Sequence, residues 1–452
     1  MSVVMKFGGT SVADAAAFEN VARIVATARE APPVVVVSAM SGVTDSLLAA
    51  TNIASLENVF ERHRAVAREL LEPAKAAEFI DRLREAADQI AAVLQSPAQK
   101  PTEQKSLQDA VVSFGETLSS ALLAEVLNQK GIKARQVDAR RCIITNEEFT
   151  SAAPLIPETF AQTNSELFPV LESGVVPVLG GFIGSTKQGV TTTLGRGGSD
   201  YTAALIGAAL DASEIQIWTD VTGVLTADPR VVPEAQTVER LSYGEAAELA
   251  YFGAKVLHPK TIQPAIENAI PVRICNSRAP QESGTLVGPE SATTPRTIKA
   301  IAHKTAVTTV QITSARMLGA YGFLRALFEI FDRHRTVIDV VTTSEVSVSL
   351  SLDDASALPA IVAELEPLGT VRVEKGLAIV CVVGEGLRGT PGIAARVFST
   401  ISDINVTLIS QGASSINFTF AIEEARVQEA VMRLHEEFFG HQKAHTAQNR
   451  ED

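Results

Sequence analysis

The chain has 452 residues, more than the ~250–300 at which a single hydrophobic core stops growing, so two or more domains are expected. Hydrophobic residues make up 46% and charged residues 20%, which are the proportions of a folded globular protein and exclude a disordered one. The net charge of −13 argues against general nucleic-acid binding, and it requires that any polyanionic ligand be held by a local group of cations.

The first part of the chain alternates predicted strands and helices. Val3–Phe7 is predicted to be a short strand ending at Gly8-Gly9, and a helix follows over 12–25. Pro33–Ser38 is a β-branched run, typical of a parallel strand buried on both faces. Residues 56–95 carry apolar side chains at mixed spacings of three and four, which predicts a mostly helical insertion or lid. Further strands are predicted at Ala134–Val137, Val175–Phe182, Ile215–Thr219 and Val272–Cys275.

This alternation predicts an α/β layered domain with a mainly parallel central sheet. The segment Ser283–Pro295 is rich in Gly, Ser, Thr and Pro, which marks a domain boundary. We therefore assign residues 1–290 to the first domain.

The rest of the chain contains an internal repeat with a shift of 70 residues, which aligns Gly322-Phe323 with Gly392-Ile393. Each copy reads as a helix, a strand, a loop and a strongly alternating strand, and another strand precedes it at Val307–Ile312 or Ala378–Val383. We predict two βαββ modules, at 296–376 and 377–440, and a disordered tail at 441–452. The open face of such a sheet must pack against the twin module or another subunit.

The first candidate motif is the run Lys6-Phe7-Gly8-Gly9-Thr10-Ser11. Paired glycines after a strand let backbone N–H groups approach a phosphate, and Lys6 can neutralise phosphate oxygens. The lysine precedes the glycines, so this is not a Walker A loop. A tight strand-to-helix turn with a surface lysine is the alternative reading.

The second motif runs from Thr193 to Asp200 and contains Gly195-Arg196-Gly197-Gly198-Ser199 before an apolar helix. An arginine between glycines has open access, and its planar fork suits a carboxylate or a phosphate. Ser199 or Asp200 is expected to cap the helix. The alternative is a capped loop with a solvated arginine.

Two further motifs lie later in the chain. Trp218–Gly223 ends a strand in Thr219-Asp220, at the strand end where open α/β sheets bind ligands, and a following loop supplies Arg230. Phe252–Pro259 contains Lys255, a candidate second phosphate clamp, and His258, which we interpret as structural. Ordinary turn chemistry is the alternative for the first of these.

Two smaller sites complete the set. Thr44 lies in a hydroxyl-rich run, 38–45, that follows the buried β-branched strand. Glu116 follows Phe114-Gly115 at the start of a helix, where it can hold a substrate ammonium or complement the helix N-terminus. No Ser-His-Asp ordering, HExxH or GxGxxG occurs, so acyl transfer, zinc hydrolysis and nicotinamide chemistry lose support.

The cellular setting is predicted from the cysteines and from the apolar segments. Cys142, Cys275 and Cys381 are far apart and form no CxxC pair, which fits a reducing cytoplasm and not a disulfide framework or a zinc site. Lys6 and two glycines interrupt the apolar start, so no signal peptide is expected. No apolar run approaches the ~18 residues of a membrane span.

Taken together, these runs resemble the aspartate kinase family, within the amino-acid kinase superfamily. KFGGTSV, SAMSGVTD, FGE, GRGGSDYTA, TDVTG, DPR and FGAKVLHP occur in the family's order over essentially the whole chain. The resemblance implies an amino-acid kinase-like sandwich followed by paired, ferredoxin-like ACT modules, one of which can be inserted in the other. The stretch 322–348 is most similar to the lysine-sensitive monofunctional subgroup.

The implied reaction is phosphoryl transfer from MgATP to the side-chain carboxylate of L-aspartate, giving 4-phospho-L-aspartate (EC 2.7.2.4). This is the first step of lysine, threonine, methionine and diaminopimelate biosynthesis. By resemblance, Lys6 and Asp200 are catalytic, and the Mg²⁺ is bound mainly through the nucleotide phosphates. The implied aspartate-binding residues are Thr44, Glu116, Arg196 and Ser199. The implied ATP-binding residues are Lys6, Gly8, Gly9, Thr219, Asp220, Arg230 and Lys255.

The resemblance also implies an amino-acid effector, with lysine first and threonine second, and a homodimer through the ACT modules, with a tetramer as the alternative. The implied effector residues are Met317, Ala320, Ile338, Asp339, Thr343, Ser344 and Glu345. Two positions depart from the family pattern. Leu225 replaces an expected aromatic in the nucleotide loop, and Gly319-Ala320 replaces polar residues in the effector segment.

Two rival functions remain open at this stage. The first is another kinase of the superfamily, acting on acetylglutamate, glutamate or a nucleotide. The second is an amino-acid sensor that keeps the fold without catalysis, which the intact Lys6, Glu116, Arg196, Asp200 and Lys255 disfavour. A fused homoserine dehydrogenase is not expected, because only a short tail follows the second module.

Overall fold

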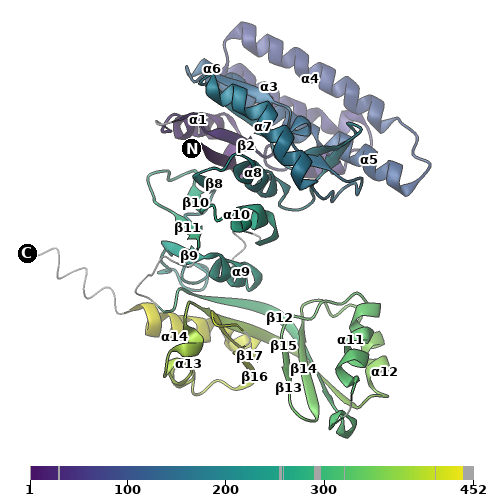
Figure 1. Cartoon of the computed structure of the whole chain (residues 1–452), viewed down its shortest axis with the longest axis vertical. Helices are drawn as coiled ribbons and strands as arrows, with labels where there is room; N and C mark the ends of the chain where they lie inside the picture. The colour runs from purple at the N-terminus through teal and green to yellow at the C-terminus, as the bar shows by residue number, and fades with distance from the viewer. Residues whose placement is uncertain are drawn as a thin grey trace, which may run out of the picture. The chain divides into compact units, whose positions relative to one another are not determined.

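The computed structural model describes residues 2–28, 31–253, 257, 259–289, 297–319, 321–412 and 414–440. These residues form two compact units (Figure 1). Unit 1 comprises 1–224, 239–243 and 256–292. Unit 2 comprises 225–238, 244–255 and 293–452, so two short segments of the predicted first domain belong to it. Lys255, His258, Ala320 and the predicted tail at 441–452 lie outside the described residues.

Unit 1 is built on an eight-stranded sheet with the order β3-β5-β2-β1-β8-β10-β11-β9. Every neighbouring pair is parallel except β10 and β11, which confirms the predicted mainly parallel sheet. The strands are β1 (Val3–Phe7), β2 (Val34–Val37), β3 (Ala134–Val137), β5 (Val176–Gly180), β8 (Glu214–Thr219), β9 (Arg240–Ser242), β10 (Val272–Asn276) and β11 (Thr285–Gly288).

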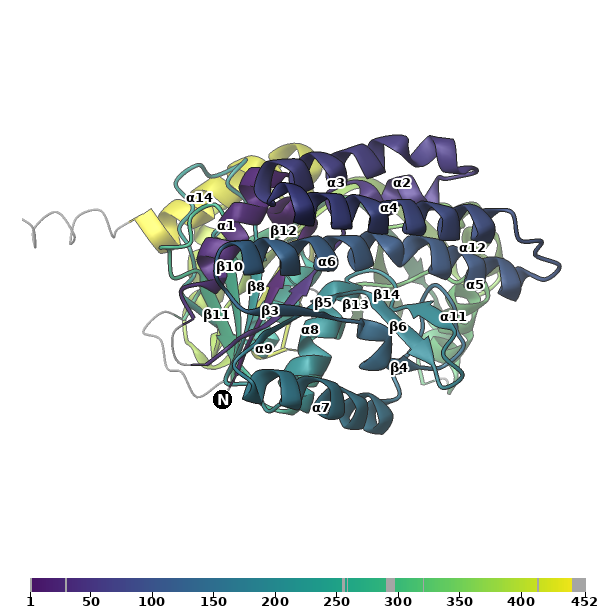
Figure 2. The ribbon, with the colours of Figure 1, turned by 90° about the horizontal axis from the view of Figure 1, so that it is seen from above.

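Helices cover both faces of this sheet, which is why the central strand β2 consists entirely of buried valines (Figure 2). Helices α1 and α6 pack on one face, with α3 and α4 outside them, and α7 and α8 pack on the other. The helices of unit 1 are α1 (Ala15–Val25), α2 (Val43–Leu48), α3 (Glu57–Leu70), α4 (Pro73–Leu94), α5 (Pro101–Val112), α6 (Phe114–Gln129), α7 (Ile156–Glu172), α8 (Gly198–Ala209) and α10 (Gln263–Glu267).

The predicted helical insertion at 56–95 corresponds to α3 and α4, and α5 extends it. Apolar side chains on the inner faces of α3 and α4 join the same core as α6 and strands β1 and β2. Although no membrane-length apolar run was expected, the stretch Pro101–Gln129, which comprises α5 and α6, contains an 18-residue window with a mean hydropathy of 1.4, long and apolar enough to cross a membrane. Because 78% of that window is buried inside the protein, these residues belong to the core of the folded unit.

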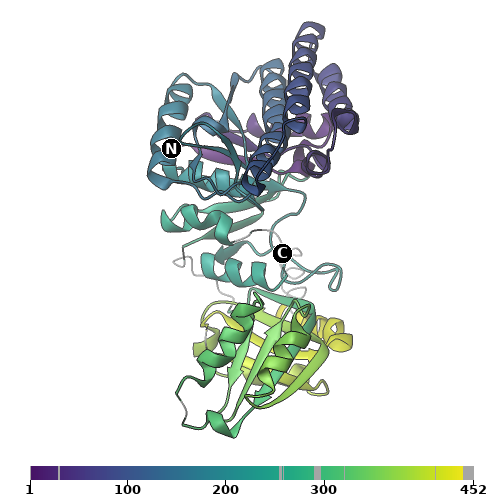
Figure 3. The ribbon, with the colours of Figure 1, turned by 90° about the vertical axis from the view of Figure 1, so that its right-hand side faces the viewer.

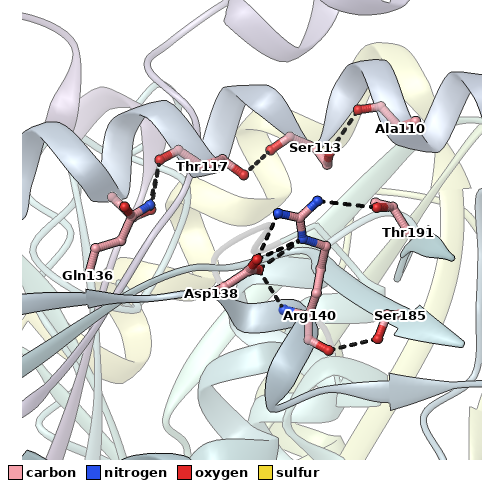
Figure 4. Close-up of polar contacts among 9 residues, drawn as sticks. Ala110, Ser113, Thr117, Gln136, Asp138, Arg140, Ser185 and Thr191 are labelled. Atoms are coloured by element: carbon pink, nitrogen blue, oxygen red, sulfur yellow. Dashed lines mark hydrogen bonds and ion pairs between the residues drawn. The ribbon is translucent and has the colours of Figure 1, made fainter. Parts of the chain in front are cut away.

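Unit 1 also contains a three-stranded sheet that was not predicted from the sequence. It has the order β4-β6-β7, with β4 (Ile144–Thr145), β6 (Ile183–Thr186) and β7 (Thr191–Thr193). These strands are too short to show an alternating pattern. Arg140 braces this sheet by pairing with Asp138 at 2.7 Å and donating to the Thr191 hydroxyl at 3.4 Å (Figure 4). Ser185 Oγ also donates to the Arg140 carbonyl.

Unit 2 is built on a six-stranded antiparallel sheet with the order β13-β14-β12-β15-β17-β16 (Figure 3). Its strands are β12 (Ala300–Thr313), β13 (Val341–Thr343), β14 (Ser347–Leu352), β15 (Thr370–Val383), β16 (Val406–Gln411) and β17 (Asn417–Glu423). Its helices are α11 (Phe323–Arg333), α12 (Leu358–Leu365), α13 (Ile393–Thr400) and α14 (Val427–Phe439), together with α9 (Tyr243–Tyr251), which is in unit 2 from its second residue on.

The repeat corresponds to two halves of this sheet, each with its own core. The first half contains α11, β13, β14 and α12, and the second contains α13, β16, β17 and α14. The two long strands β12 and β15 pass through both halves, so Ala300–Lys304 pairs with the end of β15 in the second half. In the sequence, the residues of the first half therefore lie between two segments that belong to the second half.

Candidate active site

A cavity of unit 1 has a volume of about 670 Å³ and collects all six of the predicted catalytic and aspartate-binding residues. Its lining residues include members of β1, α2, α5, α6, β7 and the first turn of α8, together with the loops after β2 and before α8. Among them are Lys6, Ser38, Thr44, Glu116, Arg196, Ser199 and Asp200. The cavity therefore combines two basic side chains with four acidic ones, so it offers partners for both charges of a small zwitterionic ligand.

Lys6 reaches the cavity because of strand alternation. Met5 and Phe7 point into the core beside α1 and α6, so Lys6 projects from the opposite face, where α8 begins. There its Nζ lies 2.7 Å from Oδ1 of Asp200, and Lys6 is only 9% exposed. The ion pair holds the ammonium at the cavity wall without a ligand.

The two glycines after β1 have different roles. The Gly8 N–H donates to the carbonyl of Trp218 at 3.1 Å, so it is already used in joining β1 to β8. Gly9 begins a short 3-10 turn, and a Cβ atom there would lie 2.9 Å from the Ala39 carbonyl. We predicted that both backbone N–H groups face a phosphate, but the N–H of Gly8 is already hydrogen-bonded within the protein. At position 9 a glycine is required, because a Cβ atom would come too close to the Ala39 carbonyl.

Arg196 lies in the loop before α8, and Ser199 and Asp200 lie in the first turn of that helix. Gly197 caps the helix with φ +76°, and no side chain caps it, so the prediction that Ser199 or Asp200 is the cap is wrong. The left-handed backbone favours glycine, and a Cβ would lie 2.6 Å from the Thr261 methyl. Arg196 is exposed at the cavity rim, whereas Ser199 is buried.

Glu116 is the most unusual group in the cavity. It is 3% exposed, its Oε1 accepts a hydrogen bond from the Ala39 N–H at 3.1 Å, and its Oε2 has no partner within the described part of the chain. Burial raises the pKa of Glu116 to about 8, because the desolvated carboxylate has few donors around it. A carboxylate in this position is poised to receive a cation from a ligand.

The predicted nucleotide residues are distributed over both units. Thr219 and Asp220 follow β8 in unit 1, where the Thr219 hydroxyl donates to Asp220 at 3.3 Å. Arg230 belongs to unit 2 and pairs with Asp228 at 2.6 Å, with its side chain 87% exposed. The Asp228 carboxylate is thereby stabilised, and the Arg230 side chain lowers its pKa. Lys255 lies outside the described residues.

The predicted effector residues lie in the first half of the unit 2 sheet. Ile338 and Met317 pack against its core, and Thr343, Ser344 and Glu345 lie at the exposed turn between β13 and β14. Asp339 has a side chain only 2% exposed and pairs with Nζ of Lys304 at 3.5 Å. Lys304 also pairs with Asp353, and Tyr251 donates to Asp339. Ala320 lies outside the described residues.

Sequence reasoning missed other residues of the cavity. Asp109 and Gln108 on α5, Thr150 and Phe182 also line it. Asp109 is 1% exposed and accepts three hydrogen bonds from Thr150 and Thr193. A polar residue at the inner face of α5 is the one signal that could have pointed to it, since the neighbouring Val111 and Val112 are buried.

Comparisons with known families and structures agree with this geometry. Residues 1–276 match the amino acid kinase family, and residues 380–438 match an ACT domain. The chain is 39% identical to lysine-sensitive aspartokinase 3 of Escherichia coli, and the alignment covers 97% of this chain and 99% of that one. It is also 39% identical to the chloroplastic aspartokinase 1 of Arabidopsis thaliana, over 97% of this chain and 80% of the relative.

Two solved structures of E. coli aspartokinase III are similar over 97% of this chain, at 38% identity. One is an R-state complex with aspartate and ADP, with a TM-score of 0.79 and all of that chain covered. The other is a T-state complex with lysine and aspartate, with a TM-score of 0.80 and 99% of that chain covered. The predicted sandwich with C-terminal ACT architecture is thus confirmed. From its sequence and its fold, the chain belongs to the aspartokinases, within the amino acid kinase family.

Proposed function

We propose that the chain transfers the γ-phosphoryl group of ATP to the side-chain carboxylate of L-aspartate, giving ADP and 4-phospho-L-aspartate. The observation that carries this proposal is the orphan Oε2 of Glu116 in a cavity that also contains Lys6 and Arg196. L-Aspartate supplies an ammonium for Glu116 and a carboxylate for each cation. The complex of the E. coli relative with aspartate and ADP supports this choice.

In the proposed reaction, an oxygen of the aspartate side chain attacks the γ-phosphorus and the bond to the ADP oxygen breaks. The attacking carboxylate is already ionised near neutral pH, so no general base is needed. Catalysis then consists of alignment and charge neutralisation. Lys6 would stabilise the charge on the transferred phosphoryl oxygens, and Asp200 would orient Lys6 through the 2.7 Å ion pair.

The four aspartate-binding assignments follow from charge and position in the cavity. Arg196 would bind the α-carboxylate with its guanidinium fork, and Glu116 would accept the ammonium. Thr44 and Ser199, which line the same cavity, would donate hydroxyl hydrogen bonds to the substrate carboxylates.

The nucleotide assignments rest on the family motifs. Gly9, Thr219, Asp220, Arg230 and Lys255 would contact ATP, and Gly8 would support the phosphate loop through its bond to Trp218. The Mg²⁺ would be carried mainly by the nucleotide phosphates and would neutralise their charge. Asp200 fits as a supporting carboxylate, because it lines the same cavity and Lys6 is its ion-pair partner among the described residues.

We also propose feedback by an amino acid, with lysine first and threonine second. The name of the E. coli relative and its complex with lysine support lysine. Burial and the neighbouring Asp353 raise the pKa of Asp339 to about 8, and an effector ammonium placed beside Lys304 would favour the ionised form of Asp339. Gly319 offers no side-chain hydrogen bond to such a ligand, unlike the polar residues of the lysine-sensitive subgroup.

A homodimer through the ACT modules, with a tetramer as the alternative, is part of the same proposal. The first module exposes apolar side chains that a second copy could cover, including Leu318 at 63% and Val337 at 73% exposure. A cytoplasmic setting is proposed because the three cysteines are all free and buried. Sedimentation of the purified chain with and without lysine would test the dimer, and a monomer at micromolar concentration would contradict it.

A coupled ADP-release assay tests the catalytic proposal. MgATP with L-aspartate should give ADP, whereas N-acetylglutamate should not. Hydroxylamine should trap the product as a hydroxamate, because an acyl phosphate reacts with this nucleophile and a phosphate monoester does not. ADP release with acetylglutamate would favour another kinase of the superfamily, and no release with aspartate would favour the sensor.

A further inference from the structure

Asp109 is a buried carboxylate that the proposed reaction does not use. It lies near the C-terminal end of α5, lines the cavity and is 1% exposed. Its Oδ2 accepts hydrogen bonds from the backbone N–H groups of Thr150, at 2.9 Å, and of Thr193, at 3.0 Å. Its Oδ1 accepts from the Thr193 hydroxyl at 2.7 Å. All the donors come from segments far from α5 in the sequence.

These bonds join two segments at the base of the arginine loop, residues 195–197, which precedes α8. Thr193 is the last residue of β7 and is separated from that loop by a single leucine. Thr150 has a left-handed backbone with φ 74°, which a non-glycine residue adopts only when surrounding contacts hold it. The Ala152 N–H donates to the Thr193 carbonyl at 2.8 Å, so the two segments are also bonded to each other.

The other end of β7 is fixed separately. Arg140 donates to the Thr191 hydroxyl, as Figure 4 shows, and β6 pairs with β7 along its length. Asp109 therefore fixes the end of β7 from which the arginine loop departs. Burial raises the pKa of Asp109, and the three hydrogen bonds oppose that rise. Burying the carboxylate costs free energy, and both of its oxygens accept hydrogen bonds that offset this cost.

We propose that Asp109 is a positioning residue for the aspartate pocket, which sets the place of Arg196 by fastening Thr193 and Thr150. The proposal rests on the assignment of Arg196 to the aspartate α-carboxylate. Asp109 makes no contact with the substrate in this role. Its effect is expected in the KM for aspartate, because a displaced Arg196 weakens substrate binding before it alters the chemistry.

The test compares Asp109→Asn, Asp109→Ala, Thr193→Val and Thr193→Ser in the ADP-release assay. Asparagine can keep an oxygen toward both N–H groups and an amide toward the hydroxyl, so its KM for aspartate should change by less than about threefold. Alanine should raise that KM by about tenfold or more, with the KM for ATP unchanged within about twofold. Thr193→Val should raise it by several-fold, and Thr193→Ser should restore it.

Three outcomes would overturn the proposal. The first is an unchanged KM for aspartate in Asp109→Ala, and the second is an equal rise in the KM for aspartate and in the KM for ATP. The third is a fall in kcat alone, which is the result that a merely destabilised protein would give. If Asp109→Ala does not fold, the Thr193 pair decides. Arg196→Ala is assayed in parallel. A normal KM for aspartate in Arg196→Ala would show that Arg196 does not bind the substrate. This result would refute the proposed aspartate pocket, whereas a normal KM in Asp109→Ala alone would refute only the positioning role of Asp109.

Discussion

The proposed aspartate pocket of unit 1 and the proposed effector site around Asp339 in unit 2 each contain a lysine paired with an aspartate, in different surroundings. In the pocket, Lys6 is 9% and Glu116 is 3% exposed, and they are held by the Asp200 carboxylate and the Ala39 N–H, respectively. In the effector segment, Asp339 is buried, but Thr343, Ser344 and Glu345 are exposed in a turn.

The difference reflects what each site must do. Phosphoryl transfer gains most from charges fixed before the substrate arrives. Lys6 and Glu116 are accordingly buried, and each has a polar partner within the protein. A regulatory site must interact differently with an effector in two states, and a partly exposed turn can change its contacts at low cost. The predictions below test whether the two lysine–aspartate pairs differ in this way.

The largest effect is expected for Lys6→Ala. Loss of the charge on the transferred phosphoryl group should lower kcat by about 10³-fold or more, while the fold is kept. The matched control is Lys304→Ala, which removes the ammonium of the comparable pair in unit 2 and should leave kcat in the absence of effector within about threefold. Turnover by ADP release and thermal melting measure both. Near-normal turnover of Lys6→Ala would remove this residue from the chemistry.

The next effect is expected for Arg196→Ala. An arginine–carboxylate interaction is strong because both partners are charged and the contact can be bidentate, so its loss should raise the KM for aspartate by about 10²-fold. The KM for ATP should stay within about twofold. Initial rates over a matrix of both substrates separate these constants. A loss confined to ATP would contradict the assignment.

The third prediction concerns pH and Glu116. Because burial raises its pKa to about 8, the free protein carries a neutral Glu116 below that pH, and binding an ammonium requires a proton to leave. The affinity for aspartate should therefore rise about tenfold per pH unit up to about pH 8, and Glu116→Gln should abolish this slope. Binding titrations from pH 6 to 9 measure it, and an equal slope in the glutamine variant would exclude Glu116.

Glu116 also makes a prediction about stability. A carboxylate with a raised folded-state pKa adds stability that is fully present below its unfolded pKa and is lost as pH rises through about 8. The ligand-free protein should thus lose stability more steeply than Glu116→Gln between about pH 5 and pH 8, and the two curves should run parallel above about pH 8. Parallel curves from denaturant unfolding below about pH 8 would show that the group titrates normally.

The smallest effect is expected in the effector segment. Asp339→Asn should raise the lysine concentration for half inhibition by about tenfold, because one charged hydrogen bond to the effector ammonium is weakened. Turnover without lysine should change by less than about twofold. Inhibition curves with lysine, and with threonine for comparison, measure this. An unchanged wild-type rate in millimolar lysine would eliminate lysine as the effector.

Much of the fold could be predicted because its signals are local. The β-branched run in β2, the exact span of β3 and the alternating strand of each repeat are visible in the sequence and present in the structure. The three short strands β4, β6 and β7 could not be predicted, because two to four residues carry no period. The cap at Gly197 was missed because its backbone conformation is set by packing on Thr261.

The sequence by itself determined the kinds of residue available for the reaction: a lysine before paired glycines, an arginine within a glycine loop and a glutamate on a helix. Only the tertiary structure decided which of these are desolvated. Glu116 is buried because Gly180 of β5 packs directly against it, where a Cβ would lie 2.8 Å from the Glu116 side chain. Asp109 likewise finds its donors on β7 and a distant turn. The desolvation of a side chain depends on atoms that segments distant in the sequence bring around it, so it cannot be predicted from a local sequence pattern.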